Sequence, residues 1–308
     1  MASDYVFHPE LRRARFLPRT VVNRRTLGLI RRVTARAARA QPAGGTIERV
    51  DDRVTVRVFR PAGAAGRVPG LLFVHGGGYV IGNAAMGDRF CRLVADRLGV
   101  VAASVEYRLA PEHPYPAPLD DCYAGLCWLA RQPDIDSERI AVAGESAGGG
   151  LAAALTLLAR ERAEVRPVFQ LLSYPMLDDR TSARAEVDPR RLRMWSRRNN
   201  RFGWTSYLGA AATAAEIPAL AAPGRCDDLA GLPPAWIGVG THDLFYDEDI
   251  IYAERLRAAG VACTLYEVPG AYHGFDLVEP GAGVSRVYRN AQLAALSAAL
   301  GDSDRVSS

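Results

Sequence analysis

A serine stands where a run of apolar residues gives way to glycines, in the stretch IAVAGESAGGG. Ser146 is the centre of a G-x-S-x-G pattern over residues 144–148, with a strand-like segment before it and a helix-like segment after it. A sharp strand-to-helix turn would strain the serine backbone, and side chains two residues away on either side would collide. The helix N-terminus would favour negative charge beside the serine. The pattern predicts a nucleophile, and an ordinary tight turn is the alternative.

A serine hydroxyl needs a base to take its proton, and histidine is the usual one. Of five histidines, His273 follows the last strand-like segment, in the glycine-flanked loop PGAYHGFD. Asp243 lies just beyond the preceding strand-like segment, and this order of serine, acid and histidine is that of α/β-hydrolase enzymes. His242 is the rival base, but it adjoins Asp243 and adjacent side chains diverge. We expect His273 as base and Asp243 as the acid that orients it.

Three glycines, residues 76–78, end another strand-like segment in FVHGGGYV. Glycine lets backbone N–H groups approach a ligand closely, and hydrolysis by a serine nucleophile needs such donors where the oxyanion develops. A phosphate cradle is the alternative, but neither GKS/T nor G-x-G-x-x-G accompanies these glycines. We expect His75 to be a structural residue that hydrogen-bonds the loop.

The composition excludes several classes of mechanism. All 38 basic residues are arginine, so a P-loop lysine and a lysine Schiff base are excluded. The net charge of +4, without a recognised motif, argues against a nucleic-acid partner. The five scattered cysteines have no CxxC pair, which favours free thiols over a disulfide framework or a zinc site. We therefore expect neither a metal nor a cofactor.

No apolar run reaches membrane-spanning length, so we expect no integral membrane association. The first residues lack the apolar core of a signal peptide, which favours a cytoplasmic protein. An arginine-rich, acid-poor segment over residues 12–39 suits either a transit peptide or an amphipathic helix of the folded protein, and we favour the helix. Both a monomer and a homodimer are compatible with the sequence.

From residue 46 onward, strand-like and helix-like segments alternate. Two alternating segments, over residues 46–50 and 54–60, suit an antiparallel hairpin, and the later apolar runs suit strands buried on both faces. We expect an α/β fold with a mostly parallel central sheet flanked by helices. The helices are expected near Asp88–Leu98, Leu119–Ala130, Ala147–Arg162, Asp249–Ala259 and Val284–Leu300.

Two segments depart from this alternation. Residues 1–45 contain one helical pattern after Pro18, and residues 178–218 form an insert rich in arginine and aromatic residues. We assign both to a small helical cap, with 1–45 as its N-terminal segment and 178–218 as its insert. Residues 46–177 and 219–303 form the catalytic core.

Several motifs together resemble the hormone-sensitive-lipase-like (bacterial family IV) esterases of the α/β-hydrolase fold. They are HGGGYV, YRLAPEHPYPAPLDD, GESAGGG, GLPPAW, HDLFYDE and YHGF, in the order and approximate spacing of that family. The resemblance implies a triad of Ser146, Asp243 and His273. It also implies an oxyanion hole made by the amides of Gly77, Gly78 and Ala147, and a cis bond before Pro111 or Pro116.

The resemblance implies a serine carboxylesterase that hydrolyses short-chain acyl esters through an acyl-enzyme and takes a small-molecule ester as its partner. An amidase, a deacetylase or another small-molecule hydrolase on the same triad is the alternative. A more remote one is an inactive ligand receptor of the same fold, a class that lacks the catalytic histidine. For the pocket we expect Tyr79, Trp204 and Tyr207 to contact substrate, with Trp195 and Leu208 nearby in the cap. Core packing of the same side chains is the alternative.

Overall fold

A computed structural model describes residues 6–63, 66–184, 187–213 and 216–301 of the chain. Its eight strands form one sheet in the order β1-β2-β4-β3-β5-β6-β7-β8. β2 pairs antiparallel with both β1 and β4, and the other neighbours are parallel, which confirms the expected hairpin and parallel sheet. The strands are β1 (Thr46–Arg49), β2 (Thr55–Phe59), β3 (Val68–Val74), β4 (Val101–Glu106), β5 (Ile135–Glu145), β6 (Phe169–Ser173), β7 (Ala235–His242) and β8 (Cys263–Tyr272).

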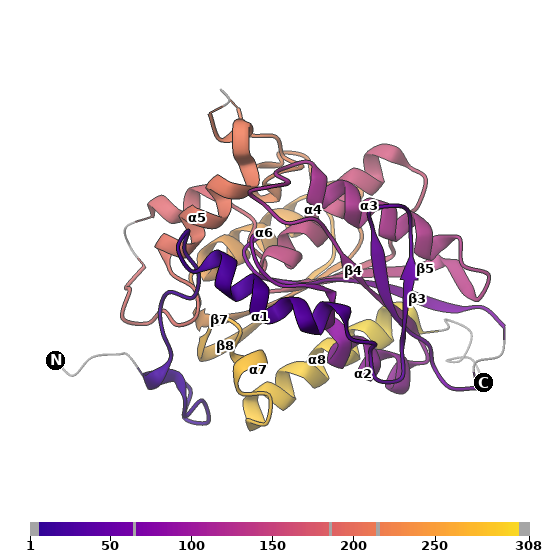
Figure 1. Cartoon of the computed structure of the whole chain (residues 1–308), viewed down its shortest axis with the longest axis horizontal. Coiled ribbons are helices and arrows are strands. Elements are labelled where there is room, and N and C mark those ends of the chain that lie inside the picture. Colours follow the sequence, from indigo (N-terminus) through magenta and orange to yellow (C-terminus); the bar gives the residue numbers. More distant parts are fainter. Residues whose placement is uncertain (1–5, 64–65, 185–186, 214–215, 302–308) are drawn as a thin grey trace.

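Helices lie on both faces of this sheet (Figure 1). α3, α4 and α6 pack in one apolar cluster on one face, and α2 and α8 pack in a second cluster on the other. The helices are α1 (Leu27–Arg39), α2 (Asp88–Leu98), α3 (Ala117–Ala130), α4 (Ala147–Arg162), α5 (Arg197–Leu208), α6 (Tyr246–Ala258), α7 (Phe275–Val278) and α8 (Gly283–Leu300). Short 3₁₀ turns are η1 (Ala14–Phe16), η2 (Ala84–Gly87), η3 (Asp179–Ala183), η4 (Gly209–Thr213) and η5 (Pro223–Arg225).

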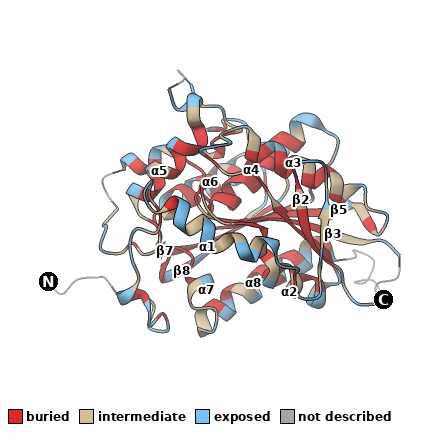
Figure 2. Cartoon of the chain, viewed as in Figure 1, coloured by how far each residue is buried: buried red, intermediate tan, exposed pale blue. Residues whose placement is uncertain are grey.

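The central strands are largely apolar where both of their faces are covered. On β3, Leu71 and Phe73 point into the cluster with α2 and α8, while Leu72 and Val74 point into the cluster with α3 and α4. All four are at most 1% exposed, and Figure 2 shows the middle of the sheet as buried. A continuous apolar run is therefore what this sheet requires.

Most element boundaries match those predicted. α2 and α4 begin and end at the expected residues. α6 begins at Tyr246, three residues before the expected Asp249, so its first turn contains Asp247, Glu248 and Asp249. The helix dipole favours carboxylates in this position. The bonds before Pro111 and Pro116 are both cis, which confirms that expectation.

The segments expected to form the cap contain helices and 3₁₀ turns but no strand in the part that the structure describes, and irregular chain joins these elements. η1 and α1 lie in the first segment, and η3, α5 and η4 lie in the insert. Hydrogen bonds join the two segments: the Val21 N–H donates to Asn199 Oδ1 at 3.2 Å, and the Met194 N–H donates to the Pro18 carbonyl at 2.8 Å. The division into cap and core stays a prediction. Residues 64–65 and 302–303 of the expected core, and residues 1–5, 185–186 and 214–215 of the expected cap, lie outside the described part.

All five cysteines are free thiols, as expected. Among the helices of the described ranges, none combines the length and apolar character needed to span a bilayer.

Arg57 ties the first helix to the sheet. Its guanidinium, on β2, donates two hydrogen bonds of 2.6 Å to the Asp88 carboxylate at the start of α2. The same group donates to the carbonyls of Ala38 and Ala40 at the end of α1, at 3.2 and 2.8 Å. Its side chain is only 4% exposed, so its charge depends on these partners.

We expect Arg57→Ala to lower the free energy of unfolding by about 3 kcal/mol, because it leaves Asp88 and two carbonyls without their donor. Urea unfolding followed by tryptophan fluorescence measures this loss. Arg97→Ala, which removes an exposed arginine of α2, is the control and should change stability by less than about 0.5 kcal/mol. Equal effects of the two substitutions would contradict the role given to Arg57.

Candidate active site

Ser146 occupies the turn between β5 and α4 in a strained backbone conformation. Its φ of 55° and ψ of −122° lie in a region that residues with a side chain rarely adopt. A Cβ on Gly144 would overlap the carbonyl of Gly148, and a Cβ on Gly148 would overlap the carbonyls of Val74 and His75. The two glycines of the pattern therefore have the steric role that the sequence predicts.

The structure brings Ser146, His273 and Asp243 together. His273 Nε2 lies 2.9 Å from Ser146 Oγ, and His273 Nδ1 lies 2.8 Å from Asp243 Oδ2. The second oxygen of Asp243 accepts the Phe245 N–H at 3.0 Å. Because Nδ1 faces a carboxylate, that nitrogen carries the hydrogen, and Nε2 is left to accept the serine proton.

Burial reinforces this arrangement. The side chain of His273 is 9% exposed and that of Asp243 is 0% exposed, so water screens their interaction weakly. Tyr174 and Phe245 pack edge-on against the His273 ring, with centroids 5.0 and 5.2 Å away. The imidazole is therefore held by apolar contacts as well as by its hydrogen bonds.

The rival histidine lies elsewhere. The His242 ring packs edge-on against Phe7, with centroids 5.3 Å apart. Burial lowers its pKa, and the charges of Arg191 and Arg193 lower it further. Of the two candidate histidines, the structure places His273 against the serine.

The glycine loop after β3 approaches the serine closely. Gly77 and Gly78 have φ values of 118° and 59°, which favour glycine. A Cβ on Gly77 would overlap the carbonyl of Ile81, and one on Gly78 would overlap the Trp195 ring. Gly76, Gly77 and Gly78 line a cavity together with Ser146, and Ala147 begins α4. Backbone donors can thus face a reacting group here.

His75 has the structural role that the sequence predicts. Its Nδ1–H donates to the Gly76 carbonyl at 2.8 Å, and its ring stacks on Tyr107 with centroids 4.2 Å apart. The Tyr107 hydroxyl donates to the His75 carbonyl at 2.9 Å. Burial lowers the pKa of His75 to about 4, so the ring is neutral at pH 7.

The cavity beside Ser146 has a volume of about 270 Å³ and a largely apolar wall. Trp195, which the sequence places near the pocket, forms part of this wall. The other side chains of the wall were not predicted from the sequence: some follow the glycine loop, some follow His273, and Tyr174 follows β6. They include Ile81, Met86, Tyr174, Leu277 and Val278.

The expected pocket residues Tyr79, Trp204 and Tyr207 are placed differently. None of them lines this cavity, and each is at most 3% exposed. Tyr79 stacks on Tyr207 with centroids 4.0 Å apart and packs against Trp204 at 5.3 Å. The Tyr79 hydroxyl donates to the Met176 carbonyl at 3.0 Å. Contact of these side chains with substrate stays a prediction: in the structure the three rings pack against one another, and Leu208, 4% exposed, is also buried.

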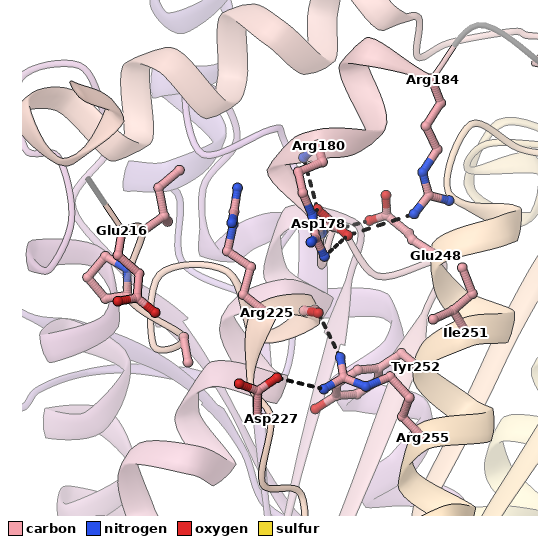
Figure 3. Close-up of a pocket in the computed structure, with 14 residues that line it drawn as sticks. Asp178, Arg180, Arg184, Glu216, Arg225, Asp227, Glu248, Ile251, Tyr252 and Arg255 are labelled. Atoms are coloured by element: carbon pink, nitrogen blue, oxygen red, sulfur yellow. Dashed lines mark hydrogen bonds and ion pairs between the residues drawn. The ribbon is translucent and has the colours of Figure 1, made fainter. Parts of the chain in front are cut away.

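A larger cavity, of about 920 Å³, lies between η3, η5 and α6 (Figure 3). Neither Ser146 nor His273 lines it. Its cations already have carboxylate partners, since Arg180 pairs with Asp178 at 2.8 Å and Arg225 pairs with Asp179 at 2.6 Å. This cavity is therefore lined by paired charges, and its lining includes no serine, cysteine or histidine.

Comparison with known proteins agrees with this geometry. A family model described as the alpha/beta hydrolase fold matches residues 71–277. The esterase LipI of Mycobacterium tuberculosis is 40% identical over 67% of this chain and 65% of its own length. The carboxylesterase NlhH of the same organism is 38% identical over 74% of each chain. The chain belongs to the hormone-sensitive-lipase-like carboxylesterases of the α/β-hydrolase fold.

Among the solved structures of this family, a bacterial heroin esterase superposes with a TM-score of 0.85. It is 39% identical, and the match covers 96% of this chain and 98% of that one. The comparison confirms the fold and the enzyme class that the motifs predict for this esterase.

The buried His75 predicts a specific pH dependence. Below pH 6.5 the unfolded state binds a proton at this histidine, whereas the folded state excludes that proton until about pH 4. Its contribution to stability is complete above pH 6.5 and is lost as the pH falls. The wild type loses this contribution between pH 7 and pH 4.5, whereas the His75→Gln variant has no such contribution to lose. The difference in free energy of unfolding between wild type and variant should therefore shrink by about 2 kcal/mol over this range.

Urea unfolding at the two pH values measures this change. The exposed His113, replaced by glutamine, is the matched control and should keep the pH dependence of the wild type. A difference between wild type and His75→Gln that stays constant with pH would contradict the burial of a neutral His75.

Proposed function

We propose that this esterase is a cofactor-free serine carboxylesterase that hydrolyses short-chain acyl esters of small molecules through an acyl-enzyme. The observation that supports the proposal most strongly is a chain of two hydrogen bonds. His273 Nε2 lies 2.9 Å from Ser146 Oγ, and His273 Nδ1 lies 2.8 Å from Asp243 Oδ2. An inactive receptor has no need of a histidine held between serine and carboxylate, so this contact favours an enzyme.

In the proposed reaction, His273 Nε2 takes the hydroxyl proton as Ser146 Oγ attacks the ester carbonyl. The oxyanion is held by the N–H groups of Gly77, Gly78 and Ala147. His273 then gives the proton to the departing alcohol, and Asp243 stabilises the imidazolium between these steps. Water repeats the sequence on the acyl-enzyme and releases the acid.

The preference for short acyl groups rests on the size of the cavity. Its wall covers an apolar chain only while that chain stays within about 270 Å³. Each covered methylene contributes up to about 0.8 kcal/mol, and each uncovered one contributes much less. Affinity should therefore rise with the first few carbons and then stop rising.

The triad assignment predicts large losses of activity. Ser146→Ala, His273→Ala and Asp243→Asn should each reduce kcat on the order of 10³-fold or more, with little change in Tm. Hydrolysis of p-nitrophenyl acetate measures kcat, and acyl anilides assayed beside it measure any amidase activity.

Two neighbouring positions are the controls. His242→Ala and Asp247→Asn remove the same chemical groups away from Ser146 and should keep kcat within a few-fold. Near-full activity of His273→Ala, with loss in His242→Ala, would contradict the assignment of the base.

The cavity size predicts the acyl preference. The kcat/KM for p-nitrophenyl esters should peak at about two to six acyl carbons and decline by about ten. Trp195→Leu should move the peak to longer chains, because a smaller side chain enlarges the pocket. Preferred hydrolysis of emulsified long-chain triglycerides, with activation at the oil surface, would contradict this account of the pocket.

A further inference from the structure

The positive charge of the chain is concentrated in its N-terminal segment. Residues 11–45 contain ten arginines and no acidic residue, whereas the rest of the chain has fewer arginines than acids. Arg31 is partly buried and pairs with Glu112 at 2.8 Å. Within the described ranges, no carboxylate lies within ion-pair distance of the other nine, all of which are exposed. These nine are Arg12, Arg13, Arg15, Arg19, Arg24, Arg25, Arg32, Arg36 and Arg39.

The same segment exposes large apolar side chains. Phe16 is 81% exposed, and Leu29 and Val33 are 64% and 71% exposed. Leu29 and Val33 lie one turn apart on α1, and Arg32 and Arg36 share their outward face. We call Phe16, Leu29, Val33 and the nine exposed arginines the basic apolar face.

This face adjoins the mouth of the cavity at Ser146. Val21, between η1 and α1, lines that cavity, as do Met86 and Leu277, which are 43% and 46% exposed. The Arg13 N–H donates to the Glu279 carboxylate at 3.1 Å, which places η1 beside the end of α7. α1 packs against η2, which carries Met86, and Figure 1 shows α1 and α7 on the near side of the molecule.

We propose that the basic apolar face docks the protein onto the surface of an anionic phospholipid bilayer, with the mouth of the cavity toward the lipid. Arginine guanidinium groups bind lipid phosphates, and apolar side chains between them enter the boundary of the headgroups. Such surfaces attract basic segments that lie within a Debye length of the membrane.

Charge and exposure favour this partner over two others. A nucleic acid would neutralise the arginines, but it offers no apolar environment for Leu29 and Val33. A second copy of the chain would bring two arginine-rich surfaces together, and their repulsion opposes contact. Of these three partners, the anionic bilayer is the one that is complementary to both features.

Co-sedimentation with vesicles tests the proposal. The protein should bind vesicles of equal parts phosphatidylcholine and phosphatidylglycerol, fail to bind phosphatidylcholine alone, and dissociate as salt is raised. The double variants Leu29→Ser/Val33→Ser and Arg32→Gln/Arg36→Gln should each reduce the partition coefficient on the order of tenfold. Both should hydrolyse water-soluble p-nitrophenyl acetate at the wild-type rate, which shows that they fold.

Matched controls lie on other elements. Val287→Ser on α8 removes a side chain that is 57% exposed, and Arg97→Gln removes an exposed arginine of α2. Both should bind the vesicles as the wild type does. Absence of binding to the anionic vesicles, or equal loss in the control variants, would overturn the proposal. So would tighter binding to duplex DNA, or a dimer that Leu29→Ser/Val33→Ser disperses.

Discussion

The close approach of α4 to β3 is the constraint on which the rest of the site depends. The carbonyls of Val74 and His75 leave no room for a Cβ on Gly148, and the carbonyl of Gly148 leaves none on Gly144. The chain between them has to turn sharply, so Ser146 adopts a positive φ and its hydroxyl projects from the end of the sheet. The same approach brings the glycine loop after β3 to the serine, because that loop begins at His75.

A second constraint decides which carboxylate orients the histidine. Asp243 and Asp249 both lie at the end of β7 or the start of α6, and both are buried. Hydrogen-bond donors reach both oxygens of Asp243, from His273 and Phe245. Neither oxygen of Asp249 has a partner within the described chain. Burial raises the pKa of Asp249 well above its ordinary value, and the charges of Glu248 and Asp243 raise it further.

Sequence predicts the sheet well because its strands are buried on both faces. Runs such as the one over Leu71–Val74 have to be wholly apolar, and amphipathic helices have to separate them. The reacting groups are predictable for a related reason: each follows directly on a strand. Ser146, Asp243 and His273 directly follow three parallel strands, β5, β7 and β8. The carboxyl ends of these strands lie at the same end of the sheet.

The wall of the pocket is less predictable, because it depends on how the helical segments pack over that edge. Tyr79 follows the glycine loop directly, yet its ring stacks in the interior on Tyr207. Trp195, in the same insert as Tyr207, reaches the cavity instead. No local sequence pattern distinguishes Trp195 from Tyr207, because the packing of the insert decides which ring reaches the cavity. The sequence therefore predicts the insert but not which of its side chains line the pocket.

In the proposed mechanism the turn presents Ser146 as an activated nucleophile. Labelling with a fluorophosphonate, followed by peptide mass spectrometry, tests it most directly because the reagent needs an activated serine and no particular substrate. We expect one adduct, on Ser146, and labelling of the His273→Ala variant that is slower on the order of 10³-fold. An adduct on another residue, or an unlabelled wild-type protein that is fully folded, would contradict it.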